Sequence, residues 1–350
     1  MFRNKTAWLQ VLFTMVFVHL ISPANADKVE YSDMDIKQLV ELDIYAASVL
    51  SAHIHQHGEW MAGYDFKIMP MEGNRDGTKN LSTTEVLSSY MITPLNMDME
   101  MHMFHLMYAP STDLTLMFMA SYVEKEMEHQ TRAGSRFTTE SSGWGDLHIK
   151  ANYIFYRQGQ NWGENQLGFT LGISLPTGSI DKKDFLPPMG STQRLPYPMQ
   201  LGSGSYDFLA GSMYLGLAEK WYWGLQGMAT IRSGYNDRHY KLSNKLTLKG
   251  WLSYAINDYL STSVKLNAMS QGNIHGSDPE LNPNMVSTAN PNLRGKKIVD
   301  FAIGAELNIP TGMFSGHDFS VDLSTPIYQN LDGPQLKTDQ VLKFAWHRVF

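Results

Sequence analysis

Methionine and histidine recur at short intervals in one segment of this chain, and both residue types can bind soft metal ions. The candidate ligands are Met97, Met99, Met101, Met103, His102 and His105. Thioether sulfur suits Cu(I), and imidazole suits Cu(II), zinc or nickel. In an extended strand, successive methionine sulfurs on one face are about 7 Å apart, which is too far for one ion. A copper site would therefore need ligands from a neighbouring strand, such as Met117 and Met119.

Two other interpretations of the methionine run need no metal. Methionine is apolar and adaptable, so it can fill space against lipid or inside a barrel. It can also form an apolar path for a hydrophobic substrate. Asp98 and Glu100 alternate with the methionines and should not face hydrocarbon. We therefore expect either that the methionine face contacts lipid or that the segment lies above the bilayer.

Charged residues form a second group, because they alternate with apolar residues in extended segments. The side chains expected to line an interior are Asp65, Lys67, His148, Lys150, Arg232, Lys265, Glu306 and Asp322. Lys249 and Asp300 follow the same pattern. Both signs of charge occur, so the residues could pair with one another or line a small polar channel.

One loop contains residue types used by hydrolases. His275, Ser277 and Asp278 lie almost next to one another, and outer-membrane lipid hydrolases use serine, histidine and a polar partner. Adjacent residues of a strand point apart, however, and Asp278 departs from the His-x-Ser-Asn arrangement of the twelve-stranded phospholipases. A lipid hydrolase is the least favoured function, and we expect no enzyme and no catalytic residues.

Composition excludes several classes of protein. The chain has no cysteine, so disulfides, thiolate metal sites and cysteine nucleophiles are excluded. Its formal charge of −6 argues against a nucleic-acid partner. Mean hydropathy is −0.27, too low for a helical membrane protein, although the chain is rich in aromatic residues and glycine.

The first 26 residues have the features of a secretory signal peptide. Arg3 and Lys5 precede an apolar run from Trp8 to Ile21, and residues 24–26 read Ala-Asn-Ala, a typical cleavage site. Residues 27–57 differ from the rest and are expected to form a periplasmic or plug-like segment. No later run reaches the about 18 apolar residues of a spanning helix.

From residue 58 onward the dominant hydrophobic period is two. Leu167, Phe169 and Leu171 point one way, for example, while small polar residues between them point the other. The same alternation predicts twelve strands, at about 60–68, 94–109, 114–122, 147–155, 166–175, 204–218, 221–231, 246–254, 260–268, 299–309, 319–327 and 338–350.

The connections between these strands alternate in length. Short ones are expected near 109–113, 158–165, 218–220, 256–258 and 310–317, and long ones near 70–93, 124–143, 176–203, 233–243, 271–295 and 330–336. Short turns on one side and long loops on the other are typical of outer-membrane barrels. The sequence therefore predicts an all-β, antiparallel transmembrane barrel of about twelve strands over residues 58–350, in the outer membrane of a Gram-negative cell.

Several segments resemble an outer-membrane transporter family assigned to the MetA pathway of phenol degradation. They are MEGNRDGT (71–78), MDMEMHMF (97–104), GWGDL (143–147), LPTGS (175–179), LPYPMQLGSG (195–204) and SDPELNP (277–283). The resemblance implies a barrel similar to transporters of hydrophobic compounds. The terminal Phe350 also resembles the signal read by the barrel-assembly machinery, although Arg348 departs from the usual pattern.

Together these features predict a channel or transporter for a small, hydrophobic or aromatic compound. The expected partners are outer-membrane lipid, the barrel-assembly machinery and the small-molecule solute. The alternative is an outer-membrane protein that handles copper with the methionine and histidine strand. No other cofactor is expected.

Overall fold

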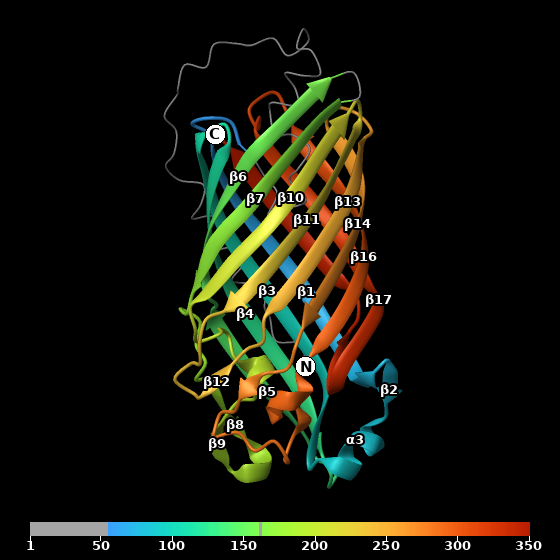
Figure 1. Ribbon diagram of the computed structural model, residues 1–350. Coiled ribbons are helices and arrows are strands. Elements are labelled where there is room, and N and C mark those ends of the chain that lie inside the picture. Colours follow the sequence, from blue (N-terminus) through green and yellow to red (C-terminus); the bar gives the residue numbers. More distant parts are fainter. Residues whose placement is uncertain (1–54, 161–162) are drawn as a thin grey trace.

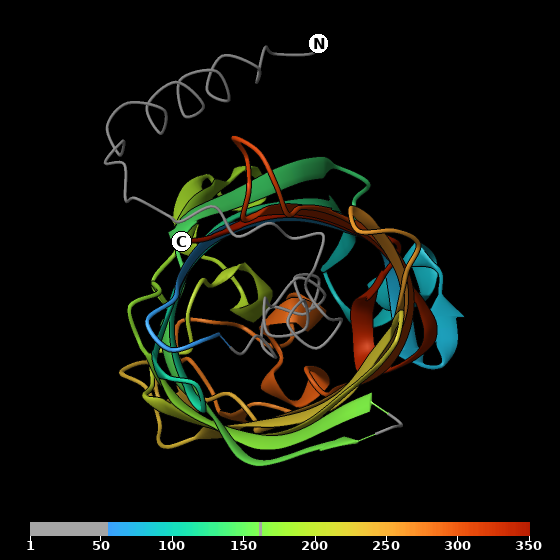
Figure 2. The ribbon, with the colours of Figure 1, turned by 90° about the horizontal axis from the view of Figure 1, so that it is seen from above.

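The computed structural model describes residues 55–160 and 163–350. Twelve long antiparallel strands form a closed ring in these residues (Figures 1 and 2). They are β1 (Trp60–Gly77), β3 (Ile92–Ser111), β4 (Leu114–Thr131), β6 (Leu147–Gln160), β7 (Gly163–Leu175), β10 (Asp207–Ala218), β11 (Trp221–Arg232), β13 (Lys245–Ala255), β14 (Leu260–Gln271), β16 (Lys296–Ile309), β17 (His317–Thr338) and β18 (Val341–Val349). The expected strand number and fold are confirmed.

The ring closes because the first and last strands pair with each other. β18 pairs with β1 in continuous register from Met61 opposite Val349 to Ile68 opposite Leu342. Each other long strand pairs with its neighbours in chain order, so the wall is an up-and-down barrel. Such closure satisfies the backbone groups along the seam, as lipid requires.

The faces of the strands show which side contacts lipid. On β7, Leu171 is 54% exposed although it is apolar, whereas its neighbour Thr170 is fully buried. The same inversion recurs around the ring, for instance at Leu246 (59% exposed) and Ile303 (53% exposed). An apolar outer face and a polar inner face are the pattern of an outer-membrane barrel. The barrel is therefore built for the outer membrane.

The longer connections carry the remaining elements, and these gather at one end of the barrel (Figure 1). They comprise β2 (Lys79–Leu81), α3 (Thr83–Ser89), β5 (Arg136–Trp144), β8 (Lys183–Leu186), β9 (Ser191–Arg194), β12 (Tyr240–Lys241), β15 (His275–Gly276) and four 3-10 turns, Pro187–Met189, Tyr197–Met199, Ser287–Ala289 and Pro291–Leu293. None of the described helices is long and apolar enough to cross a membrane. Because long loops are external in such barrels, we assign this end to the cell exterior.

Three of the predicted long connections are partly strand in the structure. Residues 70–77, expected to begin a loop, continue β1. Residues 124–131 continue β4 and pair with β5, so the loop expected at 124–143 is a tall hairpin. The connection expected at 330–336 lies within β17, because Leu331 and Leu336 pair with β1. In the hairpin the outward residues are glutamates, which hides the period-two signal. The predicted signal peptide, and the segment 27–57 except its last three residues, lie outside the described residues.

Candidate functional site

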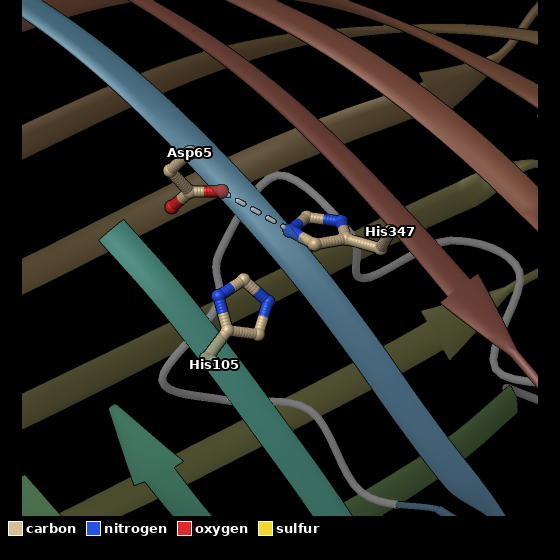
Figure 3. Close-up of side chains that lie close together, drawn as sticks. All are labelled: Asp65, His105 and His347. Atoms are coloured by element: carbon tan, nitrogen blue, oxygen red, sulfur yellow. Dashed lines mark hydrogen bonds and ion pairs between the residues drawn. The ribbon is translucent and has the colours of Figure 1, made fainter. Parts of the chain in front are cut away.

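Three buried side chains converge on the inner face of the barrel seam (Figure 3). His105 of β3 and His347 of β18 both lie opposite Gly63 of β1, and Asp65 is the next inward residue of β1. A Cβ atom at position 63 would overlap both imidazole rings, so only glycine leaves room for them. The glycine therefore allows two histidines to approach each other across a central strand.

Ion pairs connect this cluster to one further strand, β17, and to a second residue of β18. His347 Nε2 lies 3.2 Å from Asp65 Oδ1, and His347 Nδ1 lies 2.7 Å from Asp318 Oδ1 on β17. Lys343 Nζ lies 3.1 Å from the other oxygen of Asp65. The donor atoms of Asp65, His105 and His347 all lie within 4.8 Å of one another, a set that could hold a divalent ion. The ion pairs already balance its charges, so we interpret the cluster as a clamp that joins β1, β17 and β18.

The methionines of β3 point inward, contrary to the expectation that they contact lipid. Met97 is only 3% exposed, and it lies between Met71 of β1 and Met127 of β4 in the strand register. The outward positions carry Asp98 and Glu100, which lie opposite Glu126 and Glu124. Carboxylates in this number cannot face hydrocarbon, so this part of the wall extends above the bilayer. A position above the bilayer is the second of the two alternatives that the sequence left open for this segment.

The inward methionines form a continuous surface, here named the methionine face. It comprises Met61, Met69 and Met71 of β1, Met97, Met99, Met101, Met103 and Met107 of β3, and Met117, Met119 and Met127 of β4. At one end Met61, Met107 and Met117 form a buried cluster, and at the other Met97 and Met127 pack with Met199. His105 lies within this face, whereas His102 points outward and its Nδ1 is 2.7 Å from the Tyr64 hydroxyl.

The charged residues expected in the interior lie on strand faces that alternate with the exposed apolar face. Lys265 Nζ is 2.6 Å from Asp322 Oδ1, and Arg232 pairs with Asp207. Glu306 is 4% exposed on β16, and His148 and Lys150 share the inner face of β6. Asp65 and Lys67 lie on the inner face of β1, with Asp65 in the seam clamp.

A group of lysines occupies the same interior and is named the lysine band. It comprises Lys67, Lys150, Lys245, Lys249, Lys296 and Lys343, from β1, β6, β13, β16 and β18. Lys249 lies within electrostatic range of Lys67, Lys150, Lys245 and Lys343. The sequence did not point to Lys245, Lys296 or Lys343; the first two are the first residues of β13 and β16 and follow predicted loops. His347 and Asp318 were also missed, since only the closed seam brings them to Asp65.

Three external loops fold together over the mouth of the barrel. We call residues 176–206, 233–244 and 272–295 the external cap; in the end-on view parts of it lie within the outline of the ring (Figure 2). At its centre Arg194 is buried, and its guanidinium pairs with Asp181, Asp278 and Glu280. Arg238 also pairs with Asp181 and Glu280. The cap is thus held by one charged network that spans all three loops.

The cap also contacts the methionine face directly. Met199 is fully buried against Met97, Met127 and Leu195. Lys125 of β4 donates from Nζ to the carbonyl oxygens of Pro198 and Gln200, at 2.8 and 2.6 Å. These contacts fix the cap to the inner wall, so it closes the external end of the methionine face.

In the loop that contains His275, Ser277 and Asp278, the aspartate contacts other residues of the cap. Asp278 is 2% exposed and its carboxylate lies 3.3 Å from Arg194 Nε. Its backbone N–H donates to the Tyr197 hydroxyl at 3.0 Å. Asp278 is therefore engaged in the cap network, which explains its burial without any role toward Ser277.

Residues 88–284 match the family described as "Putative MetA-pathway of phenol degradation". The chain belongs to this family. The region that matches the phenol-degradation family runs from α3 to the third loop of the cap, and so includes most of the methionine face.

One solved structure shows the same fold. An outer membrane channel from Pseudomonas putida F1 has a TM-score of 0.58 and 16% identity over 84% of this chain and 96% of that one. The β domain of the Bordetella autotransporter BrkA matches 84% of this chain and 100% of that one at 9% identity and a TM-score of 0.42. A FadL homologue from Pseudomonas aeruginosa matches 83% of this chain and 89% of that one at 8% identity and a TM-score of 0.36. No curated protein sequence matches the chain significantly.

Proposed function

We propose that this protein is a passive outer-membrane channel for a small hydrophobic or aromatic compound. The observation that carries the proposal is the methionine face, which runs along the inner wall from Met61 and Met107 to Met97 and Met127. Flexible thioether side chains make favourable contacts with aromatic rings and adapt to different apolar shapes. The family description, which refers to phenol degradation, supports the same kind of solute.

The position of the external cap supports a controlled path. Met199 of the cap covers the outer end of the methionine face, so an apolar solute that displaced it would meet a similar surface. At the opposite end, Met61 and Met107 are buried against Met117. We infer that both ends of the path are closed by side chains that can change rotamer rather than by rigid backbone.

Uptake of 1-N-phenylnaphthylamine tests this function, because an intact outer membrane excludes this aromatic probe. Cells that express the protein should take up the probe several-fold faster than cells without it. Replacing Met101 and Met103 with asparagine should lower the added rate by about tenfold, since buried amides raise the barrier by about 1–2 kcal/mol.

The control is Met91→Asn, because Met91 lies off the methionine face and is 52% exposed. Both variants must show the heat-dependent gel mobility of a folded barrel. A rate that matches cells without the protein, despite correct assembly, would rule out the proposed passage.

A second candidate function is copper handling, and one observation favours it. Five methionines from β1, β3, β4 and the cap pack together at the outer end of the methionine face, whereas one strand alone would hold its sulfurs too far apart. They are Met71, Met97, Met99, Met127 and Met199. Thioethers in this number suit Cu(I). Titration of purified protein with Cu(I) should show saturable binding that is lost when Met97, Met99, Met101 and Met103 are replaced by leucine. Unchanged affinity in that variant would remove the copper hypothesis.

A further inference from the structure

The lysine band places like charges next to one another on the inner wall. Lys67 of β1 lies directly opposite Lys343 of β18 in the strand register. Gln271 lies opposite Lys245 on one side and opposite Lys296 on the other, so one residue separates these two lysines across the sheet. Like charges at such positions are destabilising unless an anion compensates them.

Carboxylates within the protein compensate only part of this charge. Asp65 pairs with Lys343 but also with His347. Asp300 lies near Lys67 and accepts a hydrogen bond from Asn267 at 3.3 Å. Within residues 55–160 and 163–350, no ion pair joins Lys150, Lys245, Lys249 or Lys296 to a carboxylate. Lys249 is exposed although it lies on the inner face, so the described residues leave open space beside its side chain.

The lysine band also adjoins the methionine face. Lys67 lies directly opposite Met101 in the pairing of β1 with β3, so their Cβ atoms are about 5 Å apart. A solute bound at this point would meet ammonium groups on one side and thioethers on the other. Rings of lysine or arginine side chains select anions in other pores.

We propose that the lysine band binds the anionic group of the transported compound while the methionine face contacts its apolar body. The solute class is an amphiphilic organic anion, a carboxylate or sulfonate attached to an apolar chain or aromatic ring. The inference rests on the proposed function of passage and adds the charge of the solute to it. Neutral aromatic compounds would use the methionine face alone and bind more weakly.

Two measurements test the charge preference separately from passage. In planar bilayers under a potassium chloride gradient, the reversal potential should show a clear preference for chloride. In uncharged detergent, calorimetric titration should show that octanesulfonate binds at least tenfold more tightly than octyltrimethylammonium, its cationic counterpart of equal chain length. The probe has the amphiphilic character that the two surfaces require.

Lysine variants locate the site. Replacing Lys245 and Lys249 with glutamine should weaken octanesulfonate binding at least tenfold and abolish the preference for chloride. Lys297→Gln is the matched control, because Lys297 is the outward neighbour of Lys296 and is exposed. Removing repelling charges should leave assembly intact, which gel mobility with and without heating would verify.

The outcomes separate the two proposals. Tight octanesulfonate binding without any current would support the lysine band and contradict passage. A current with no anion preference, together with equal binding of the two amphiphiles, would support passage and overturn the anion site. Equal losses in Lys297→Gln and in the Lys245 and Lys249 variant would also overturn it.

Discussion

Replacing Arg194 with glutamine is expected to open the external cap and to increase the conductance of the barrel several-fold. The arginine side chain is 1% exposed and pairs with Asp278, whose side chain is 2% exposed. Loss of one partner from a buried ion pair costs about 3–5 kcal/mol, because the remaining charge stays buried. The twelve-stranded wall does not depend on this residue, so the variant should assemble normally.

Acid should have the same effect on the wild-type cap. The hydrogen bonds from Arg238 and Arg194 lower the pKa of Asp181, and the hydrogen bond from Arg194 lowers that of Glu280. Because their pKa values are lowered when the cap is closed, the two carboxylates stabilise the closed cap fully at any pH above the ordinary carboxyl pKa of about 4. This stabilisation is lost as the pH falls through the lowered values. Conductance should therefore rise when the external solution is acidified below about pH 4, and less so in Arg194→Gln.

Lys183→Gln provides the control for the cap. Lys183 Nζ lies 3.8 Å from Glu280 Oε2, and both side chains are about half exposed, at 48% and 47%. Exposed pairs of this kind contribute about 0–1 kcal/mol, so this variant should conduct like the wild type. Limited proteolysis of the cap and single-channel recording would measure the two variants. Equal protection of the cap in Arg194→Gln and wild type would show that the network does not hold it closed.

Replacing Asp65 with alanine is expected to destabilise the barrel seam by about 3–5 kcal/mol. The substitution leaves His347, which is fully buried, and Lys343 without the carboxylate that lies between them. These residues lie on the strands that close the ring, so the loss should lower the free energy of unfolding of the whole barrel. Urea unfolding in lipid vesicles, followed by tryptophan fluorescence, would measure it.

Asp339→Ala is the matched control for the seam. Asp339 pairs with Lys337 at 3.2 Å near the same strands, but the side chains are 37% and 32% exposed. Its removal should cost no more than about 1 kcal/mol. If the two alanine variants unfolded at the same urea concentration, the buried clamp would stabilise the barrel no more than an exposed ion pair does.

The strand pattern was predictable wherever the outer surface touches lipid. Leu167, Phe169 and Leu171 alternate with small polar residues, because one side of that strand must be apolar and the other must not. The prediction was wrong at 124–131, where Glu124, Glu126 and Glu128 occupy the outward positions. Above the bilayer the outer face needs no apolar residues. The strand therefore continues there, but its outward residues no longer alternate with the inward ones in hydrophobicity.

The inner clusters could not be predicted from the sequence because they depend on register between distant strands. His347 Nε2 and Asp65 Oδ1 are within hydrogen-bond distance although 282 positions separate the residues. Their contact requires ring closure and a glycine at position 63, whose importance no local pattern reveals. The run of methionines was visible in the sequence. That its side chains point inward was not, because their orientation depends on how far β3 and β4 extend above the lipid.

The height of the wall differs around the ring. β1, β3 and β4 contain 18, 20 and 18 residues, whereas β11, β13 and β14 contain 12, 11 and 12. At about 3.3 Å per residue, the longer strands continue roughly 20 Å beyond the shorter ones. The cap loops connect mainly the shorter strands. They cross the mouth of the barrel and contact Lys125 and the methionines of the longer strands β3 and β4. If those contacts break, we expect the mouth to open on one side only, beside β3 and β4, so that a solute would arrive along these strands rather than down the barrel axis.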